Sequence, residues 1–181
     1  MILIDVGAAG EILPRFSGTK NKTIIALEPD PKAFADLQKK YSSQDYIIIN
    51  EALSSKEQEV DIHLTQKGQC SSIYKPNLKL LNKFPFSERF DIKTKTKIKT
   101  KTLDQLLEAH KLKHPNYIKL DIQGAELDAL KGSEKTLKKT EVIILEVSFF
   151  KFMKGAPEFY EVICFMKEYG FVAYDILKGF Y

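Results

Sequence analysis

The amino-acid sequence predicts an α/β fold with a doubly wound, mainly parallel sheet, because strand-like and helix-like segments alternate along the chain. The expected core strands are short apolar runs, which is typical of strands buried on both faces. Several runs end in a glycine-rich turn or an acidic residue, and ligands of such sheets bind at the carboxyl ends of the strands. The length of 181 residues fits one domain, so we expect 1–181 to form a single domain.

Local signals predict the individual elements of this fold. The apolar runs that predict core strands are Ile2–Val6, Thr23–Leu27, Tyr46–Ile49, Tyr117–Leu120 and Val142–Val147. The expected helices are Pro31–Tyr41, about Ala125 to Lys138, and Glu158–Tyr169. Asp30 is placed to cap the first of these helices, which begins with a proline. The last helix stops at Gly170, and we expect Phe171–Ile176 to form a further strand.

A β-rich insertion over about residues 54–101 separates the third and fourth core strands. It contains a β-like run at Val60–Leu64, a loop at Gly68–Ser72, a helix-like segment at Asn77–Lys83 and an alternating stretch at Asp91–Thr102. This last stretch, the lysine strand, places isoleucine and threonine on one face and lysine on the other. We interpret it as a solvated edge strand, since lysines discourage edge-to-edge aggregation. The alternative is a surface that attracts an anionic substrate or partner.

Composition excludes several classes of protein. No apolar run approaches the roughly 20 residues of a membrane span, and the N-terminus does not resemble a secretory signal. Cys70 and Cys164 are interpreted as unpaired thiols of a cytoplasmic protein. His63, His110 and His114 lack zinc-ligand spacing, so we expect no metal. The net charge of +4 is too small to indicate a nucleic-acid partner.

The strongest local signal is the glycine-rich turn after the first strand, Asp5-Val6-Gly7-Ala8-Ala9-Gly10. Small residues there let the backbone approach a ligand. A dinucleotide site requires a different glycine spacing, and the carboxylates of Asp5 and Glu11 would repel a diphosphate. They suit the ammonium and sulfonium groups of S-adenosylmethionine. The competing interpretation is that Asp5 only forms a turn after a buried strand.

A second acid supports a nucleoside site. Glu28 ends the second strand about 20 residues after the glycine turn, where a carboxylate can accept hydrogen bonds from both ribose hydroxyls. An acid at a strand end is common and therefore weak evidence alone. The pair of signals at this spacing is stronger, and the missing phosphate features favour an adenosyl group over a dinucleotide.

Further ionisable residues follow the fourth and fifth strands. Lys119, Asp121 and Glu126 surround the end of the fourth strand, and Glu146 ends the fifth. Acids that converge on one cleft have separated pKa values, and one of them can serve as a general base. We therefore predict Asp121, Glu126, Glu146 and Lys119 as catalytic residues. The competing interpretation is that Asp121 and Glu126 only stabilise the start of a helix.

At these residues the sequence resembles the FkbM-type methyltransferase family. The phrase Lys119-Leu120-Asp121-Ile122-Gln123-Gly124-Ala125-Glu126 is similar to the signature of that family. Similar phrases occur in the family's order at Asp5-Val6-Gly7-Ala8, Glu28-Pro29-Asp30, Ala52-Leu53-Ser54, Cys70-Ser71-Ser72, Thr102-Leu103-Asp104 and Glu146-Val147. Together they cover nearly the whole chain.

The resemblance implies a class I, Rossmann-like methyltransferase fold with S-adenosylmethionine as cofactor and a sugar or other small-molecule hydroxyl as acceptor. It further implies a list of cofactor-binding residues: Asp5, Gly7 and Ala8 at the methionine part, Glu28 and Pro29 at the ribose, Ala52 and Leu53 at the adenine, and Asp121. The loop at Cys70–Ser72 would lie near cofactor and acceptor. The glycine turn departs from the commoner Ala-Asn-x-Gly. The final antiparallel strand of this class is missing, so the sheet is short or the chain truncated.

Three alternatives to this function are open. Base methylation is disfavoured, because Asp121-Ile122-Gln123-Gly124 has neither proline nor an aromatic residue to stack a flipped base. An enzyme that uses NAD or a nucleotide sugar is opposed by the glycine spacing. A catalytically silent adenosyl-binding or interaction module, which contacts its partner through the lysine strand, is the alternative from another class.

Overall fold

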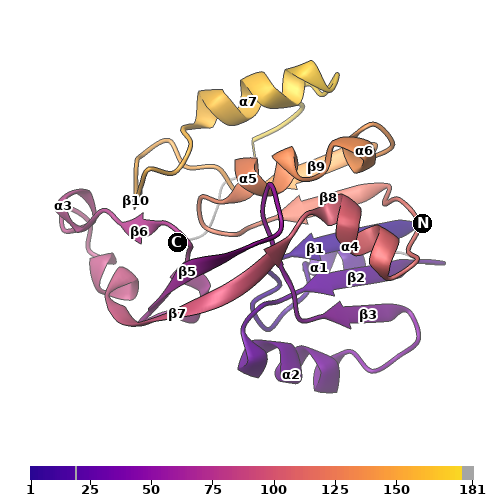
Figure 1. The fold of residues 1–181 in the computed structure, drawn as a ribbon, viewed down its shortest axis with the longest axis horizontal. Coiled ribbons are helices and arrows are strands. Elements are labelled where there is room, and N and C mark those ends of the chain that lie inside the picture. The colour runs from indigo at the N-terminus through magenta and orange to yellow at the C-terminus, as the bar shows by residue number, and fades with distance from the viewer. Residues whose placement is uncertain (19, 177–181) are drawn as a thin grey trace.

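The computed structural model describes residues 1–18 and 20–176 and confirms the predicted α/β fold. Within this part of the chain, five parallel strands form the central sheet in the order β3-β2-β1-β8-β9 (Figure 1). Their bounds are β1 Ile2–Val6, β2 Thr23–Leu27, β3 Tyr46–Ile49, β8 Tyr117–Leu120 and β9 Val142–Leu145. The order reverses direction at β1, so β1 and its neighbours β2 and β8 occupy the position where doubly wound sheets bind ligands.

Helices cover both faces of the sheet because successive strand residues point to opposite sides. Leu3 and Ile24 pack with α1 and α2, whereas Ile4 and Ile25 pack with α4, α5, α6 and α7. The bounds of these helices are α1 Pro14–Ser17, α2 Pro31–Lys40, α4 Leu103–Ala109, α5 Glu126–Lys131, α6 Glu134–Leu137 and α7 Phe159–Glu168. The strands are therefore buried on both faces, as their unbroken apolar runs predict.

Helix boundaries follow the local signals at α2 but not between α5 and α6. The Asp30 side chain accepts a hydrogen bond from the Ala33 N–H at 2.8 Å, which confirms the predicted cap. The prediction of one continuous helix from about Ala125 to Lys138 is wrong, because the helix is interrupted at Gly132 and Ser133, between α5 and α6. At this glycine the carbonyl of Ser54 approaches so closely that an added Cβ would lie 2.3 Å from its oxygen. The break lets the connection after β3 pack against the helix layer.

The segment over residues 54–101 builds a second, smaller sheet. Its strands are β5 Gln58–Thr65 and β7 Ile92–Lys101, and β4 Ala52–Leu53 completes the order β4-β7-β5. Near it, β6 Lys75–Pro76 pairs with β10 Met153–Lys154. The remaining short helices are η1 Gly68–Cys70, α3 Leu78–Leu81 and η2 Ser87–Phe90. The β6–β10 pairing ties this segment to the chain that follows β9.

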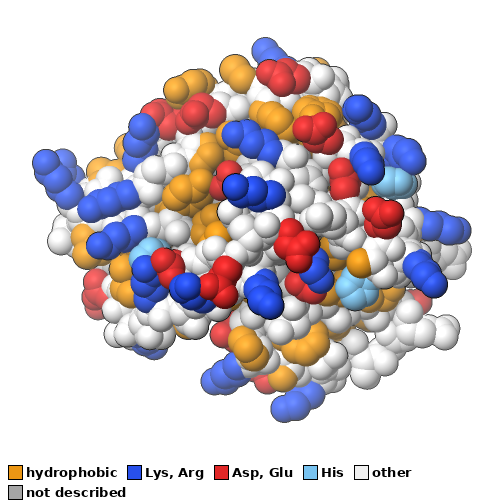
Figure 2. Space-filling model, in the orientation of Figure 1, with side chains coloured by type: hydrophobic (Ala, Val, Ile, Leu, Met, Phe, Trp, Pro, Cys, Tyr) orange, Lys and Arg blue, Asp and Glu red, His pale blue; other side chains and the backbone are white. Residues whose placement is uncertain are grey.

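The prediction that the lysine strand is a solvated edge strand is confirmed for most of its length. This strand is β7, and from Ile92 to Lys99 it pairs only with β5 among the described residues and is exposed except at the half-buried Ile98. Its last two residues, Thr100 and Lys101, also pair with β4, which gives the sheet order β4-β7-β5. Acidic residues of β5 stand opposite its lysines, and the Nζ atoms of Lys95 and Lys97 lie 2.7 Å from carboxylate oxygens of Asp61 and Glu59. Figure 2 shows basic and acidic side chains intermixed on this face of the molecule. The sequence of β7 alone did not show that its partner strand supplies these opposite charges.

The prediction of a strand at Phe171–Ile176 is wrong. This segment has no strand structure, and the side chains of Val172 and Tyr174 are 81% and 98% exposed. A strand forms only where a neighbour satisfies its backbone hydrogen bonds, and β9 pairs with β8 alone among the described residues. Residues 171–176 therefore add nothing to the central sheet.

Over residues 1–18 and 20–176, no helix is both long and apolar enough to cross a membrane. The same residues contain no group of three or more His, Cys, Asp or Glu side chains that could hold a metal ion.

Candidate functional site

The glycine turn lies across the carboxyl ends of β1 and β2. The N–H groups of Gly7 and Ala8 both donate to the carbonyl of Leu27, at 3.0 and 3.3 Å. Gly7, Ala9 and Gly10 have φ values of +77°, +40° and +91°. This left-handed backbone is the conformation that glycine adopts without strain. The turn therefore brings the ends of the two strands together at the edge of the sheet.

Gly7 also packs against the loop that follows β8. A Cβ added to Gly7 would lie 2.1 Å from the carbonyl oxygen of Asp121, far inside the limit of real contacts. Only a residue without a side chain permits this approach. The predicted cofactor residue Gly7 and the predicted catalytic residue Asp121 are thus direct neighbours.

Glu28 holds the glycine turn from the end of β2. Its buried carboxylate accepts hydrogen bonds from the N–H groups of Ala9 and Asp30, at 2.7 and 2.9 Å. Burial raises the pKa of Glu28, and the two backbone hydrogen bonds oppose that rise. Each carboxylate oxygen can accept a second hydrogen bond, so both can also receive a hydroxyl group. Pro29 is half-buried between Glu28 and the cap residue Asp30.

Lys119 joins three groups beneath the turn. Its Nζ atom lies 3.0 Å from Oδ1 of the fully buried Asp5 and 3.6 Å from Oδ2 of Asp121. It also donates to the carbonyl oxygen of Gly7 at 3.1 Å. The other carboxylate oxygen of Asp5 accepts from the N–H of Leu13. These contacts favour a positioning role for Lys119 and Asp5, and proton transfer by Lys119 stays a prediction.

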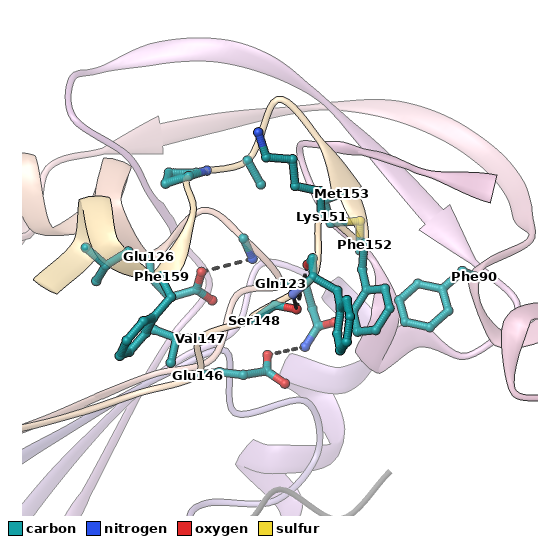
Figure 3. A pocket seen from close by; sticks show the side chains of 15 residues that line it. Phe90, Gln123, Glu126, Glu146, Val147, Ser148, Lys151, Phe152, Met153 and Phe159 are labelled. Carbon is teal, nitrogen blue, oxygen red and sulfur yellow. Dashed lines mark hydrogen bonds between the residues drawn. The ribbon is translucent and has the colours of Figure 1, made fainter. Parts of the chain in front are cut away.

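Gln123 links the ends of β8 and β9. Its side-chain amide donates to Asp121 Oδ1 at 3.0 Å and to a carboxylate oxygen of Glu146 (Figure 3). Its backbone has a φ of +53°, and its carbonyl accepts from the hydroxyl of Ser72 at 2.7 Å. Sequence reasoning missed Gln123 because an amide carries no charge. Its place inside the Asp121–Glu126 phrase was the one available signal.

Glu126 is buried at the start of α5. Its two carboxylate oxygens accept hydrogen bonds from the N–H groups of Ile122 and Gly124, at 2.8 and 2.9 Å. Burial raises the pKa of Glu126 to about 7, although these hydrogen bonds lower it. The carboxyl group therefore fixes the loop at 122–124, and a role in proton transfer stays a prediction.

Replacing Glu126 with Gln should flatten the dependence of stability on pH. The folded pKa lies above the ordinary 4.5, so the folded state holds this proton more tightly than the unfolded state does. The resulting stabilisation is complete below pH 4.5 and is lost as pH rises through about 7. Urea unfolding should show that the free energy of unfolding falls by about 2–3 kcal/mol more in wild type than in Glu126→Gln between pH 5 and 8. Glu168→Gln, on the exposed side of α7, is the control and should follow wild type.

The other predicted residues surround this centre. Ala52 and Leu53 form β4 after β3, where both are buried and Leu53 packs into the core. An adenine contact by either residue stays a prediction. Cys70 is half-buried, and burial raises the pKa of its thiol. The Cys70–Ser72 loop reaches the strand ends through the bond from Ser72 to Gln123.

A pocket opens beside Gln123 and Glu146. Its lining comes from the loop after β8, from the segment between Glu146 and Phe159, and from Phe90 of the insertion. Figure 3 shows Phe90 and Phe152 on one side of Gln123 and Phe159 on the other. The glycine turn and Glu28, together called the cradle, thus lie at the ends of β1 and β2. The pocket lies at the same edge of the sheet, beside β8 and β9.

Comparisons with known proteins agree with this architecture. The family model of the methyltransferase FkbM domain matches residues 5–173. The 2-O-methyltransferase NoeI of Sinorhizobium fredii is 26% identical over 163 residues, which are 85% of this chain and 66% of NoeI. The hexuronic acid methyltransferase AglP of Haloferax volcanii is 38% identical over 50 residues, which are 28% of this chain and 21% of AglP. The chain thus spans less than two thirds of the length of either relative.

A solved structure shares the fold. The crystal structure of methyltransferase FkbM from Methylobacillus flagellatus superposes with a TM-score of 0.50 and 18% sequence identity. The match covers 80% of this chain and 32% of the other. At this identity the likeness shows the fold alone, whereas the family model spans most of the sequence. The chain therefore belongs to the FkbM methyltransferase domain family.

Proposed function

We propose that the protein is an S-adenosylmethionine-dependent methyltransferase that methylates a hydroxyl oxygen of a sugar or another small molecule. The observation that carries the proposal is the cradle at β1 and β2, where the buried carboxylate of Glu28 stands beside a glycine turn that Gly7 packs closely against Asp121. Two relatives are methyltransferases, and one is named for a hexuronic acid acceptor. The chain's membership in the same family supports the same class of reaction.

The residues of the cradle fit an adenosyl cofactor better than a dinucleotide. The Glu28 carboxylate can accept hydrogen bonds from ribose hydroxyls. Lys119 offsets part of the negative charge of Asp5 and Asp121. Together with Glu28, the site still holds three carboxylates against this one lysine, which disfavours a diphosphate and favours a cationic ligand. Bound S-adenosylmethionine would supply a methyl group activated by its sulfonium.

The protein's own residues would orient the acceptor and take up its proton. Asp121 and Glu146 stand at the ends of neighbouring strands, and Gln123 fixes both carboxylates by hydrogen bonds. Glu146 can then accept the hydroxyl proton or anchor a neighbouring hydroxyl. Holding the acceptor oxygen in line removes the entropic cost of that alignment from the reaction step.

A transfer assay tests the proposed reaction. The chain would be incubated with S-adenosylmethionine labelled at its methyl group and a panel of neutral sugars, hexuronic acids and oligosaccharides. We expect label in at least one glycan, bound as a base-stable methyl ether. Binding of S-adenosylhomocysteine without transfer to any acceptor would instead support a catalytically silent module.

Replacing Glu28 with Ala should weaken binding of S-adenosylhomocysteine by about 1.5–3 kcal/mol, the usual worth of hydrogen bonds to a charged group. The variant loses the ribose acceptor and the bonds to the N–H groups of Ala9 and Asp30. Glu11→Ala is the matched control, because Glu11 adjoins the same turn but is exposed and pairs only with Lys40 in the ion pairs described. Calorimetry should show a nearly unchanged dissociation constant for the control. Equal constants for wild type and Glu28→Ala would place the ribose elsewhere.

A further inference from the structure

The pocket beside Glu146 has two chemically different walls. Phe90, Phe150 and Phe152 form an aromatic wall, in which the ring of Phe152 contacts both other rings. Gln123 and Glu146 lie on the polar side, and Figure 3 shows both of them with Phe90 and Phe152. Ligand sites commonly combine a mostly apolar lining with a few polar groups that fix orientation. The polar side belongs to the carboxyl ends of β8 and β9, so this pocket adjoins the proposed reaction centre.

Gln123 connects the pocket to that centre directly. It lines the pocket and donates hydrogen bonds to both Asp121 and Glu146. Asp121 in turn supplies the carbonyl that contacts Gly7. A molecule in the pocket would therefore lie one side chain away from the cofactor cradle.

The aromatic wall offers a surface for a flat, partly apolar ring. Phe150 is 55% exposed, and its ring centroid lies 5.7 Å from that of Phe152 and 5.8 Å from that of Phe84. The electron-rich faces of such rings attract the slightly positive C–H groups of a ligand. A pyranose ring presents C–H groups on its face and hydroxyls around its edge, which matches the two walls.

The charge of the pocket discriminates between neutral and anionic rings. Its ionisable lining residues are Glu126, Glu146 and Lys151. Lys151 forms an ion pair with Glu158, which offsets its charge, and Asp121 adds a further carboxylate through Gln123. A carboxylate on the ligand would meet this negative potential, whereas neutral hydroxyls can donate to Glu146.

We propose that this pocket is the acceptor subsite and that it selects a neutral pyranose ring over a hexuronic acid. The ring stacks on Phe150 and places its hydroxyls at Glu146. The inference rests on the proposed function and narrows it to one substrate class. It separates this chain from its relative AglP, which is named for a hexuronic acid.

Saturation-transfer NMR on protein loaded with S-adenosylhomocysteine tests the subsite without requiring turnover. The probes are two matched pairs: the methyl β-glycosides of glucose and glucuronic acid, and those of galactose and galacturonic acid. In at least one pair the neutral glycoside should bind at least about fivefold tighter than the uronide, as expected for a charge near partly buried carboxylates. Glu146→Gln should reduce the difference in affinity between the neutral glycoside and the uronide.

Two aromatic variants test whether glycoside binding depends on the aromatic wall. Phe150→Ala should weaken binding of the neutral glycoside at least about fivefold, because a side chain that stacks on the ligand is removed. Tyr160→Ala is the control, since Tyr160 is also an aromatic residue, is 60% exposed and does not line the pocket. It should bind the glycoside as wild type does.

The outcomes separate the subsite from the proposed function. Binding of S-adenosylhomocysteine with no glycoside binding, equal or tighter binding of the uronides, or equal effects of Tyr160→Ala and Phe150→Ala would each overturn the subsite. Failure to bind S-adenosylhomocysteine would overturn the proposed function, and the subsite with it.

Discussion

Replacing Glu146 with Gln should lower the rate of methyl transfer at least about tenfold and leave cofactor binding unchanged, since general-base assistance is worth about 10²–10⁴-fold. A sugar hydroxyl has a pKa far above neutrality, so a nearby carboxylate assists as the oxygen attacks the methyl carbon. Glu146 is half-buried, lines the pocket and is oriented by Gln123. Glutamine keeps its shape and removes its charge.

Glu141→Gln is the control for this effect. Glu141 precedes the opposite end of β9 and accepts a hydrogen bond from Asn116, away from the carboxyl edge of the sheet. Single-turnover kinetics with a confirmed acceptor should show slower methyl transfer by Glu146→Gln than by wild type. The rate of Glu141→Gln should equal that of wild type. A wild-type rate for Glu146→Gln would move the base to Asp121 or Glu126, and then to His63 or the Cys70–Ser72 loop.

Replacing Gly7 with Ala should destabilise the fold by about 3–5 kcal/mol, the sum of a steric clash and backbone strain. The new Cβ would lie 2.1 Å from the carbonyl oxygen of Asp121, and the residue has a φ of +77°. Because backbone cannot move aside as a flexible side chain can, the turn and the β8 loop must separate. Urea unfolding measures the loss, and binding of S-adenosylhomocysteine should be lost with it.

Gly10→Ala separates the clash from the strain. Gly10 has a φ of +91° but no atom within 4 Å of an added Cβ. This variant should lose only about 1–3 kcal/mol, the cost of a left-handed backbone for a residue with a side chain. Equal losses in the two variants would show that the turn is not packed against Asp121.

The sequence predicted the core strands because burial on both faces produces unbroken apolar runs. Ile2–Val6 and Tyr117–Leu120 match β1 and β8 residue for residue. It failed where structure depends on a partner that a local pattern cannot show. Phe171–Ile176 is apolar enough for a strand, but it has no strand structure and Val172 and Tyr174 are exposed. The lysine strand is solvated as expected, but its own sequence does not show that β5 supplies acidic partners for Lys95 and Lys97.

The candidate site was predictable to the extent that topology fixes it. Parallel strands place their carboxyl ends at one edge, so the acids near the ends of β1, β2 and β8 had to converge. The amide bridge of Gln123 and the aromatic wall with Phe150 arise from loop conformations and from contacts with the insertion. Neither leaves a periodic or charged signature in the sequence.

Calorimetric titration of the wild-type chain with S-adenosylhomocysteine and, separately, with NAD tests the central claim most directly. The cradle of Glu28 and the glycine turn predicts saturable binding of S-adenosylhomocysteine at one site per chain and no binding of NAD. The carboxylates of Glu28, Asp5 and Asp121 outnumber the one lysine, Lys119, that pairs with two of them, so their remaining negative charge would repel the diphosphate of NAD. Tight binding of NAD without affinity for S-adenosylhomocysteine would contradict the account.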